Sequence, residues 1–167
     1  MESWIIRRAS RSTCGGPAAL SSFHWDLEEG IITNQSTGRR MTMMAPEALE
    51  AVFRELEAEL GDIIPKAVVE AQRRFIMAGA YSIDEISDEG DFRTQLAVRG
   101  CGNLRHIYLG EDGLDLRIDN AAAPLMIVGL AQALFEMALA VDSDAEWQIS
   151  EEGDLEVKIT PQNGSPY

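Results

Sequence analysis

Cys101 and His106 are the residues whose types and spacing come closest to a catalytic pair. Cys101 lies between two glycines, Gly100 and Gly102, where a thiol would be accessible, and His106 follows five residues later. A nucleophilic thiol needs a base within hydrogen-bond reach, and a histidine in the strand that follows does not clearly converge with Cys101. We prefer the alternative, a glycine turn with a small apolar cysteine and a structural histidine. No catalytic residue is predicted.

Glu136 is a carboxylate inside an otherwise apolar segment, Pro124 to Val141. Such a group must be solvated, paired, or shifted toward its neutral form. Our first interpretation places it at the exposed edge of a helix. The alternative pairs it with an arginine or with a ligand, and the candidate arginines are Arg73, Arg74 and Arg99.

Metal and cofactor sites lack sequence support. The two cysteines and two histidines, Cys14, Cys101, His24 and His106, do not lie at ligand spacings. The Gly100–Gly102 turn lacks the third glycine and the following helix of a dinucleotide fingerprint. We therefore expect no metal and no cofactor.

Length and charge limit the class of protein. A chain of 167 residues fits one domain. Its net charge of −14 repels nucleic acid phosphates and anionic membrane surfaces, so neither is an expected partner. With two distant cysteines, a reducing, cytoplasmic location is predicted. The apolar stretch from Ala121 to Val141 is interrupted by Glu136 and flanked by acids. This favours a helix buried in a core or in a subunit interface over a membrane span.

Three regions are expected along the chain. Residues 1–22 mix arginine, serine and glycine without periodicity and are predicted to form a poorly ordered arm. Residues 23–160 form the domain, and residues 161–167 a tail. The domain begins with a small antiparallel meander from Phe23 to Met44, because short alternating runs there are separated by turn residues.

Helical periodicity follows the meander. Pro46 opens a helix that Gly61 ends, and Asp62 can cap a second helix. A third, shorter helix is predicted from Phe92 to Val98. The expected apolar face of the first helix is Leu49, Val52, Phe53, Leu56 and Leu60, and that of the second is Ile64, Val68, Ala71, Phe75 and Ala78 or Gly79.

Two hairpins complete the predicted fold around the apolar helix. The first joins residues 104–108 to 114–118, and the second joins 146–149 to 155–159. Strands that meet as hairpins form an antiparallel sheet. The sequence therefore predicts an α+β fold with helices packed on one face of the sheet.

Six segments from Ala48 onward carry a recognisable pattern. They are Glu59-Leu60-Gly61, Ala71 to Phe75, Arg99 to Asn103, Leu116 to Asn120, Gly129 to Glu136, and the hairpin beginning at Trp147. In these segments the chain resembles the 4-vinyl reductase domain family, whose superfamily looks related to TRAPP subunits and to haem–nitric oxide-binding domains. Many members carry metal-holding cysteines in the last helix and hairpin. This chain has no cysteine after Cys101, so that role is not carried over.

The resemblance implies a pocket for a small, largely apolar molecule between helices and sheet. We expect it near the Gly100–Gly102 turn and the helix that bears Phe75, where small alanines leave space beside a bulky ring. The candidate ligand-binding residues are Ala71, Phe75, Tyr81, Cys101, His106 and Glu136.

The sequence thus predicts a domain that binds or senses a small apolar or aromatic molecule, and a non-enzymatic role is preferred to an enzymatic one. A homodimer is expected, because the helix from Pro124 to Val141 has few polar positions and Gly129 allows close helix approach. The alternative is a non-catalytic scaffold subunit that acts through its dimer surface. A third possibility is an accessory enzyme of tetrapyrrole or aromatic metabolism.

Overall fold

The computed structural model describes residues 23–35, 37–80 and 89–162. The chain divides into two compact units, with the boundary between Met44 and Ala45. The predicted arm, most of the predicted tail and Tyr81 lie outside the described residues.

The first unit contains the predicted meander. Its strands β1 (Phe23–Asp26), β2 (Ile31–Asn34) and β3 (Arg40–Met41) pair antiparallel in the order β1-β2-β3. Asp26 closes the first turn, because its Oδ1 accepts hydrogen bonds from the backbone N–H groups of Glu28 at 3.1 Å and Glu29 at 3.0 Å. The prediction of a meander is confirmed.

The second unit is built on a four-stranded antiparallel sheet in the order β4-β5-β7-β6. Its strands are β4 (Asn103–Gly110), β5 (Gly113–Asp119), β6 (Ser143–Ile149) and β7 (Leu155–Pro161). Alternate side chains of β5 and β7 are buried and pair across the strands: Leu114 with Ile159, Leu116 with Val157, and Ile118 with Leu155. These residues form the inner face of the sheet, as the two-residue period requires. Both predicted hairpins are confirmed.

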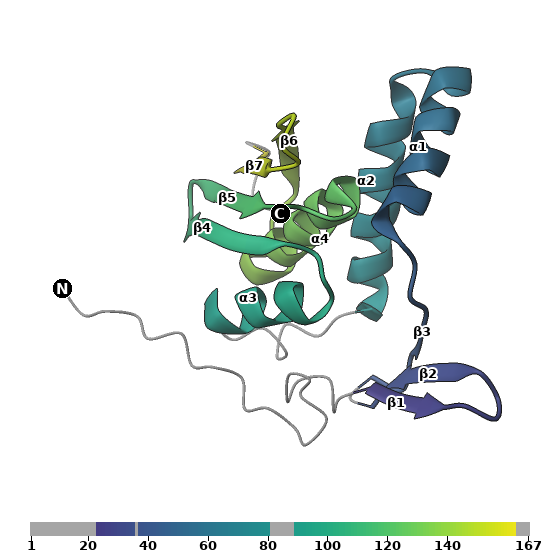
Figure 1. The fold of residues 1–167 in the computed structure, drawn as a ribbon. Helices are drawn as coiled ribbons and strands as arrows, with labels where there is room; N and C mark the ends of the chain where they lie inside the picture. Colours follow the sequence, from purple (N-terminus) through teal and green to yellow (C-terminus); the bar gives the residue numbers. More distant parts are fainter. Residues whose placement is uncertain (1–22, 36, 81–88, 163–167) are drawn as a thin grey trace. The chain divides into compact units, whose positions relative to one another are not determined.

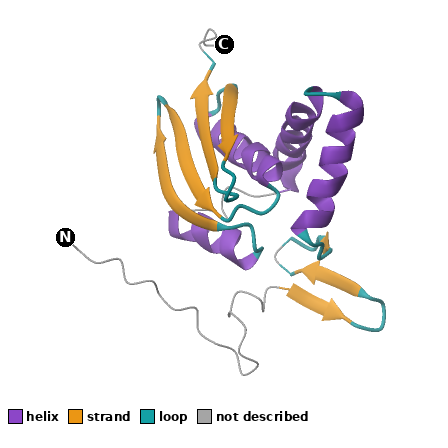
Figure 2. Ribbon diagram, turned by 45° about the horizontal axis from the view of Figure 1, so that its top comes forward, coloured by secondary structure: helices purple, strands orange, loops and turns teal. Residues whose placement is uncertain are grey.

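The helices of this unit are α1 (Pro46–Leu60), α2 (Ile63–Phe75) with its π-helical extension η2 (Ile76–Ala80), α3 (Glu89–Val98) and α4 (Pro124–Leu139). Helix α4 contacts β6 and β7 on one side and α2 on the other, and α1 lies beside α2 (Figures 1 and 2). Ile127, Val128 and Phe135 of α4 join the inner face of the sheet in one core. The α+β fold with helices on one face of the sheet is confirmed.

Helix α4 is buried inside the chain itself, which is one of the two settings that the sequence left open. Gly129 lies where α4 crosses α2, and a Cβ at this position would stand 2.4 Å from the carbonyl oxygen of Val69 and 2.7 Å from Cβ of Gln72. The close approach that glycine allows is therefore made to α2 of the same chain. Within the described ranges, no helix is long and apolar enough to cross a membrane.

The predicted buried face of α2 is wrong by about one residue. Val69 and Ile76 are the buried positions, whereas Ala71 and Phe75 are exposed, Phe75 at 51%. One residue corresponds to a rotation of about 100° around a helix axis. The rotation of α2 about its axis is fixed by contact with α4, because Gly129 of α4 lies against the backbone of Val69.

Other local expectations need smaller corrections. Helix α1 has the predicted ends, but Val52, Leu56 and Leu60 of its apolar face stay exposed. Asp62 makes no side-chain hydrogen bond that caps α2. Helix α3 begins three residues before Phe92, and α4 ends at Leu139, where the next residue turns into a left-handed conformation.

Candidate functional site

A cavity of about 240 Å³ lies among the helices of the second unit. Its apolar wall consists of Leu49, Phe92, Leu96, Met126, Ile127 and Leu130, with the small residues Cys101, Ala122 and Ala123 beside them. Gln72, Gln95 and Arg99 are its polar lining residues. The cavity is thus a mainly apolar space with a few polar groups, the general composition of a small-molecule site.

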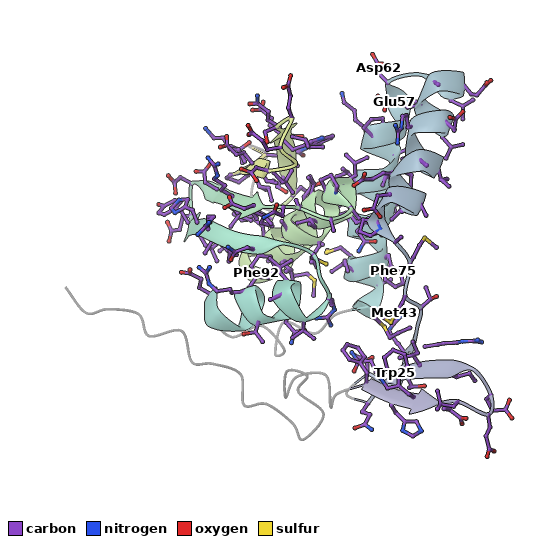
Figure 3. The ribbon with its side chains drawn as sticks, viewed as in Figure 1. Trp25, Met43, Glu57, Asp62, Phe75 and Phe92 are labelled. Atoms are coloured by element: carbon purple, nitrogen blue, oxygen red, sulfur yellow. The ribbon has the colours of Figure 1, made fainter. Side chains whose placement is uncertain are left out.

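Helix α3 and the residue after it form one wall, because their spacing places four side chains on one side. Phe92, Gln95, Leu96 and Arg99 recur at intervals of three and four residues, which share a helix face. Figure 3 labels Phe92 on α3, and its side chain is 4% exposed. The first turns of α4 form the wall on another side. Leu49 of α1 and Gln72 of α2 complete the lining of the cavity.

The turn from Arg99 to Gly102 brings Cys101 into the cavity wall. Gly100 and Gly102 have φ values of 69° and 122°, in the region that favours glycine. The Cys101 N–H donates to the carbonyl of Leu96 at 2.9 Å, and the Cys101 carbonyl accepts from Ala122 N–H at 3.2 Å. Burial raises the pKa of the Cys101 thiol, and the charge of Arg99 opposes the rise. The thiol therefore stays protonated at neutral pH.

The cavity is near the predicted turn. The described residues that line it belong to helices and to the segments beside them, and none belongs to a strand of the sheet. The reason is that α4 lies directly on the inner face of the sheet and fills it with Ile127, Val128 and Phe135. Space is left on the side of α4 that faces α3 and Gln72 of α2. This arrangement corrects the expectation of a pocket between helix and sheet.

The predicted ligand-binding residues do not come together at one place. Cys101 lines the cavity. Ala71 and Phe75 lie on the exposed surface of α2, where Figure 3 labels Phe75 at the end of the helix. His106 is an exposed residue of β4 and lines a groove over the sheet together with Arg117 and Trp147. The ligand-binding roles of these residues stay predictions.

Glu136 is 4% exposed and belongs to a polar network between α2, α4 and β6. Its Oε2 accepts a hydrogen bond from Nη1 of Arg73 at 2.6 Å. Its Oε1 accepts from the backbone N–H of Ser143 at 3.1 Å and from the Ser143 hydroxyl at 2.9 Å. Gln132 Nε2 donates to the Ser143 carbonyl at 2.8 Å. The interpretation of Glu136 as an exposed edge residue is wrong, and its pairing with Arg73 is confirmed.

Arg73 extends this network to the surface of α2. Its Nε donates to Oε2 of Glu70 at 2.7 Å, and Arg74 donates to Oε1 of the same carboxylate at 2.7 Å. The hydrogen bond from Arg73 lowers the pKa of Glu70 to about 2, against the effect of burial. The hydrogen bond to Glu70 likewise raises the pKa of Arg73. Glu70 and Arg73 are therefore ionised at neutral pH, and the network joins three elements.

Sequence reasoning missed Gln72 and Gln95, and it considered Arg99 solely as a partner for Glu136. The sequence did indicate that Gln95 and Arg99 lie on the same side, because they are four residues apart at the end of a helix that a glycine turn follows. In the structure, Arg99 Nη1 donates to the side-chain Oε1 of Gln95 and, at 3.2 Å, to the backbone carbonyl of Gln95.

In the part of the chain that the structure describes, no group of three or more His, Cys, Asp and Glu residues could hold a metal ion.

Comparison with known proteins identifies the fold. No family model matches the sequence, and no curated protein sequence matches it. The phenol-responsive sensory domain of the transcription activator PoxR, solved with phenol, superposes with a TM-score of 0.62 and 12% identity, over 84% of this chain and 85% of that one. The two chains therefore share a fold.

Two H-NOX structures are also similar, at lower scores. A mutant of Cs H-NOX has a TM-score of 0.46 and 13% identity, over 78% of this chain and 80% of that one. The I5F mutant of T. Tengcongensis H-NOX has a TM-score of 0.44 and 13% identity, over 75% and 79%.

Proposed function

We propose that this chain is a sensory domain that binds a small molecule with one aromatic ring in the cavity beside Cys101. The observation that carries the proposal is the size and lining of the cavity, about 240 Å³ with a mainly apolar wall. An apolar cavity of about 150 Å³ holds benzene in another protein, so the volume suits one ring with a substituent. The fold shared with a phenol-responsive domain supports the same class of ligand.

The cavity also favours binding over the scaffold alternative. Protein interiors are close-packed, and voids larger than a water molecule are few. The residues that line a void lose dispersion contacts on that side, and a ligand of the right shape restores them. A scaffold subunit would have no such use for a space beside Phe92, Leu96 and Met126. Membership of the 4-vinyl reductase domain family, which the sequence motifs suggest, agrees with this proposal.

Phenol is expected to bind the wild-type chain, and Ala122→Leu is expected to weaken that binding at least tenfold. Ala122 lines the cavity, and three added carbon atoms there occupy the volume that the ring needs. Titration followed by protein NMR measures the dissociation constants. The matched control is Ala97→Leu, because Ala97 is an exposed residue of α3 outside the cavity wall.

The control variant should bind phenol as the wild type does. If the wild-type protein binds none of the three compounds phenol, benzoate and benzamide at millimolar concentration, the proposed function is wrong. Unchanged binding by a folded Ala122→Leu protein would place the site elsewhere. Circular dichroism and thermal unfolding establish that each variant is folded.

We further propose that the domain is a homodimer. The apolar surface of α4, from which the sequence predicted a dimer, is buried within the chain. Support now comes from α1, where Val52, Leu56 and Leu60 are exposed at 54%, 40% and 62%. Light scattering at tens of micromolar should give twice the mass of 18.4 kDa, and Leu56→Glu should give the monomer mass. A monomeric wild type would overturn this proposal.

A further inference from the structure

Gln72 is a polar residue on the buried face of helix α2. It follows Val69 by three residues and precedes Ile76 by four, the spacings that place side chains on one face of a helix. Val69 is 4% exposed and Ile76 is fully buried. Gln72 also packs against α4, because a Cβ added to Gly129 would stand 2.7 Å from its own Cβ. A carboxamide on the core face of a helix needs a hydrogen-bond partner.

The polar side chains around Gln72 have partners within the protein. Arg73, the next residue, donates to the carboxylate of Glu136. In the cavity wall, the side chain of Gln95 accepts a hydrogen bond from Arg99. The side-chain amide of Gln72 makes no hydrogen bond to another described residue. Gln72 is half-buried and lines the cavity, so a ligand there can supply the partner.

The volume of the cavity limits the size of that ligand. An apolar cavity of about 150 Å³ holds benzene, which has six non-hydrogen atoms. In the same proportion, a cavity of about 240 Å³ suits about nine or ten non-hydrogen atoms. Phenol has seven and leaves part of the space unfilled. One aromatic ring with a polar group of three non-hydrogen atoms fills the cavity better.

We propose that the ligand is a neutral aromatic carboxamide, with its ring against the apolar wall and its amide paired with the side-chain amide of Gln72. This inference rests on the proposed function, because it specifies the ligand of the same site. A glutamine side chain has a carbonyl oxygen that accepts and an NH2 group that donates. A carboxamide matches both groups, since each amide donates to the carbonyl oxygen of the other.

A carboxylate of the same size matches Gln72 less well. It has no N–H to donate, so the carbonyl oxygen of Gln72 would face a second acceptor. It also brings a charge into a mainly apolar space, and burying a charge costs more than burying a neutral group that is hydrogen-bonded. The need for one donor and one acceptor beside a ring therefore selects the carboxamide.

The test compares benzamide with acetophenone, in which a methyl group replaces the NH2 group and the shape is nearly unchanged. Acetophenone accepts hydrogen bonds and donates none. Calorimetric titration at neutral pH gives the ratio of the benzamide affinity to the acetophenone affinity. In Gln72→Met this ratio should fall about fivefold from its wild-type value, the worth of one hydrogen bond. Gln148→Met is the control, because it removes the same amide from an exposed position of β6 outside the cavity, and it should leave the ratio unchanged.

Gln72→Glu separates hydrogen bonding from packing. The carboxylate keeps an acceptor for the N–H of benzamide and offers no donor to either carbonyl. A hydrogen bond to a charged acceptor is stronger than one to a neutral acceptor, so the ratio should rise about threefold or more. If Gln72→Met does not fold, this variant decides the question by itself.

The possible failures are distinguishable. If the ratio in Gln72→Met stays within twofold of the wild type, if it falls in Gln72→Glu, or if phenol binds and benzamide does not, the inference is overturned and the proposed function stands. If phenol, benzoate and benzamide all fail to bind, both are overturned.

Discussion

Replacing Glu136 with alanine is expected to lower the free energy of unfolding by about 3 kcal/mol or more, because it removes one member of a buried ion pair. The carboxylate is 4% exposed and accepts hydrogen bonds from Arg73 and from both the N–H and the hydroxyl of Ser143. Each buried donor left without an acceptor costs about 1–3 kcal/mol. Arg73 keeps its bonds to Glu70, which limits the loss on that side.

Urea denaturation measures this change, with Glu146→Ala as the control. Glu146 is an exposed residue of β6, so its loss should change the free energy of unfolding by about 0.5 kcal/mol or less. Glu136→Gln should lie between the two, because its carbonyl oxygen can still accept from Ser143. A Glu136→Ala protein as stable as the control would mean that the network between α2, α4 and β6 contributes nothing to stability.

Replacing Gly129 with alanine is expected to destabilise the protein by about 2–3 kcal/mol, the cost of overpacking a filled contact. The new methyl group would stand 2.4 Å from the carbonyl oxygen of Val69, which is backbone and cannot rotate away. Helix α2 must therefore shift relative to α4. Because Gln72 lies in this contact and lines the cavity, phenol affinity should fall in the same variant.

The control for Gly129→Ala measures how much alanine is favoured over glycine in a helix when no steric clash is present. Alanine is favoured over glycine by about 1 kcal/mol within a helix, so without a steric clash the substitution would stabilise the protein. Ala138→Gly, at an exposed position of α4, measures that preference directly and should destabilise by about 1 kcal/mol. If Gly129→Ala stabilises the protein by the same amount, the close contact of α2 and α4 does not exist. Thermal and urea unfolding give both values.

The sequence by itself determined the elements whose causes are local. Proline at the start and glycine after the end set α1 at Pro46–Leu60. Alternation in β5 and β7 fixed which side chains face inward, since a shift of one residue would expose the whole apolar set. The buried character of α4 was also predictable from its composition. These signals depend on neighbours a few residues away, and the α+β fold follows from them.

Tertiary structure alone decided the side of α2 that is buried, because adjacent valines, Val68 and Val69, leave its apolar face ambiguous. Contact with Gly129 settles the choice. The sequence likewise offered three arginines as partners of Glu136. Tertiary packing selects Arg73, which lies 63 residues away in the chain. The cavity draws its walls from four helices, the turn after α3 and the segment before α4. No local pattern marks such a space, because it depends on how side chains distant in sequence fail to fill the volume between packed helices.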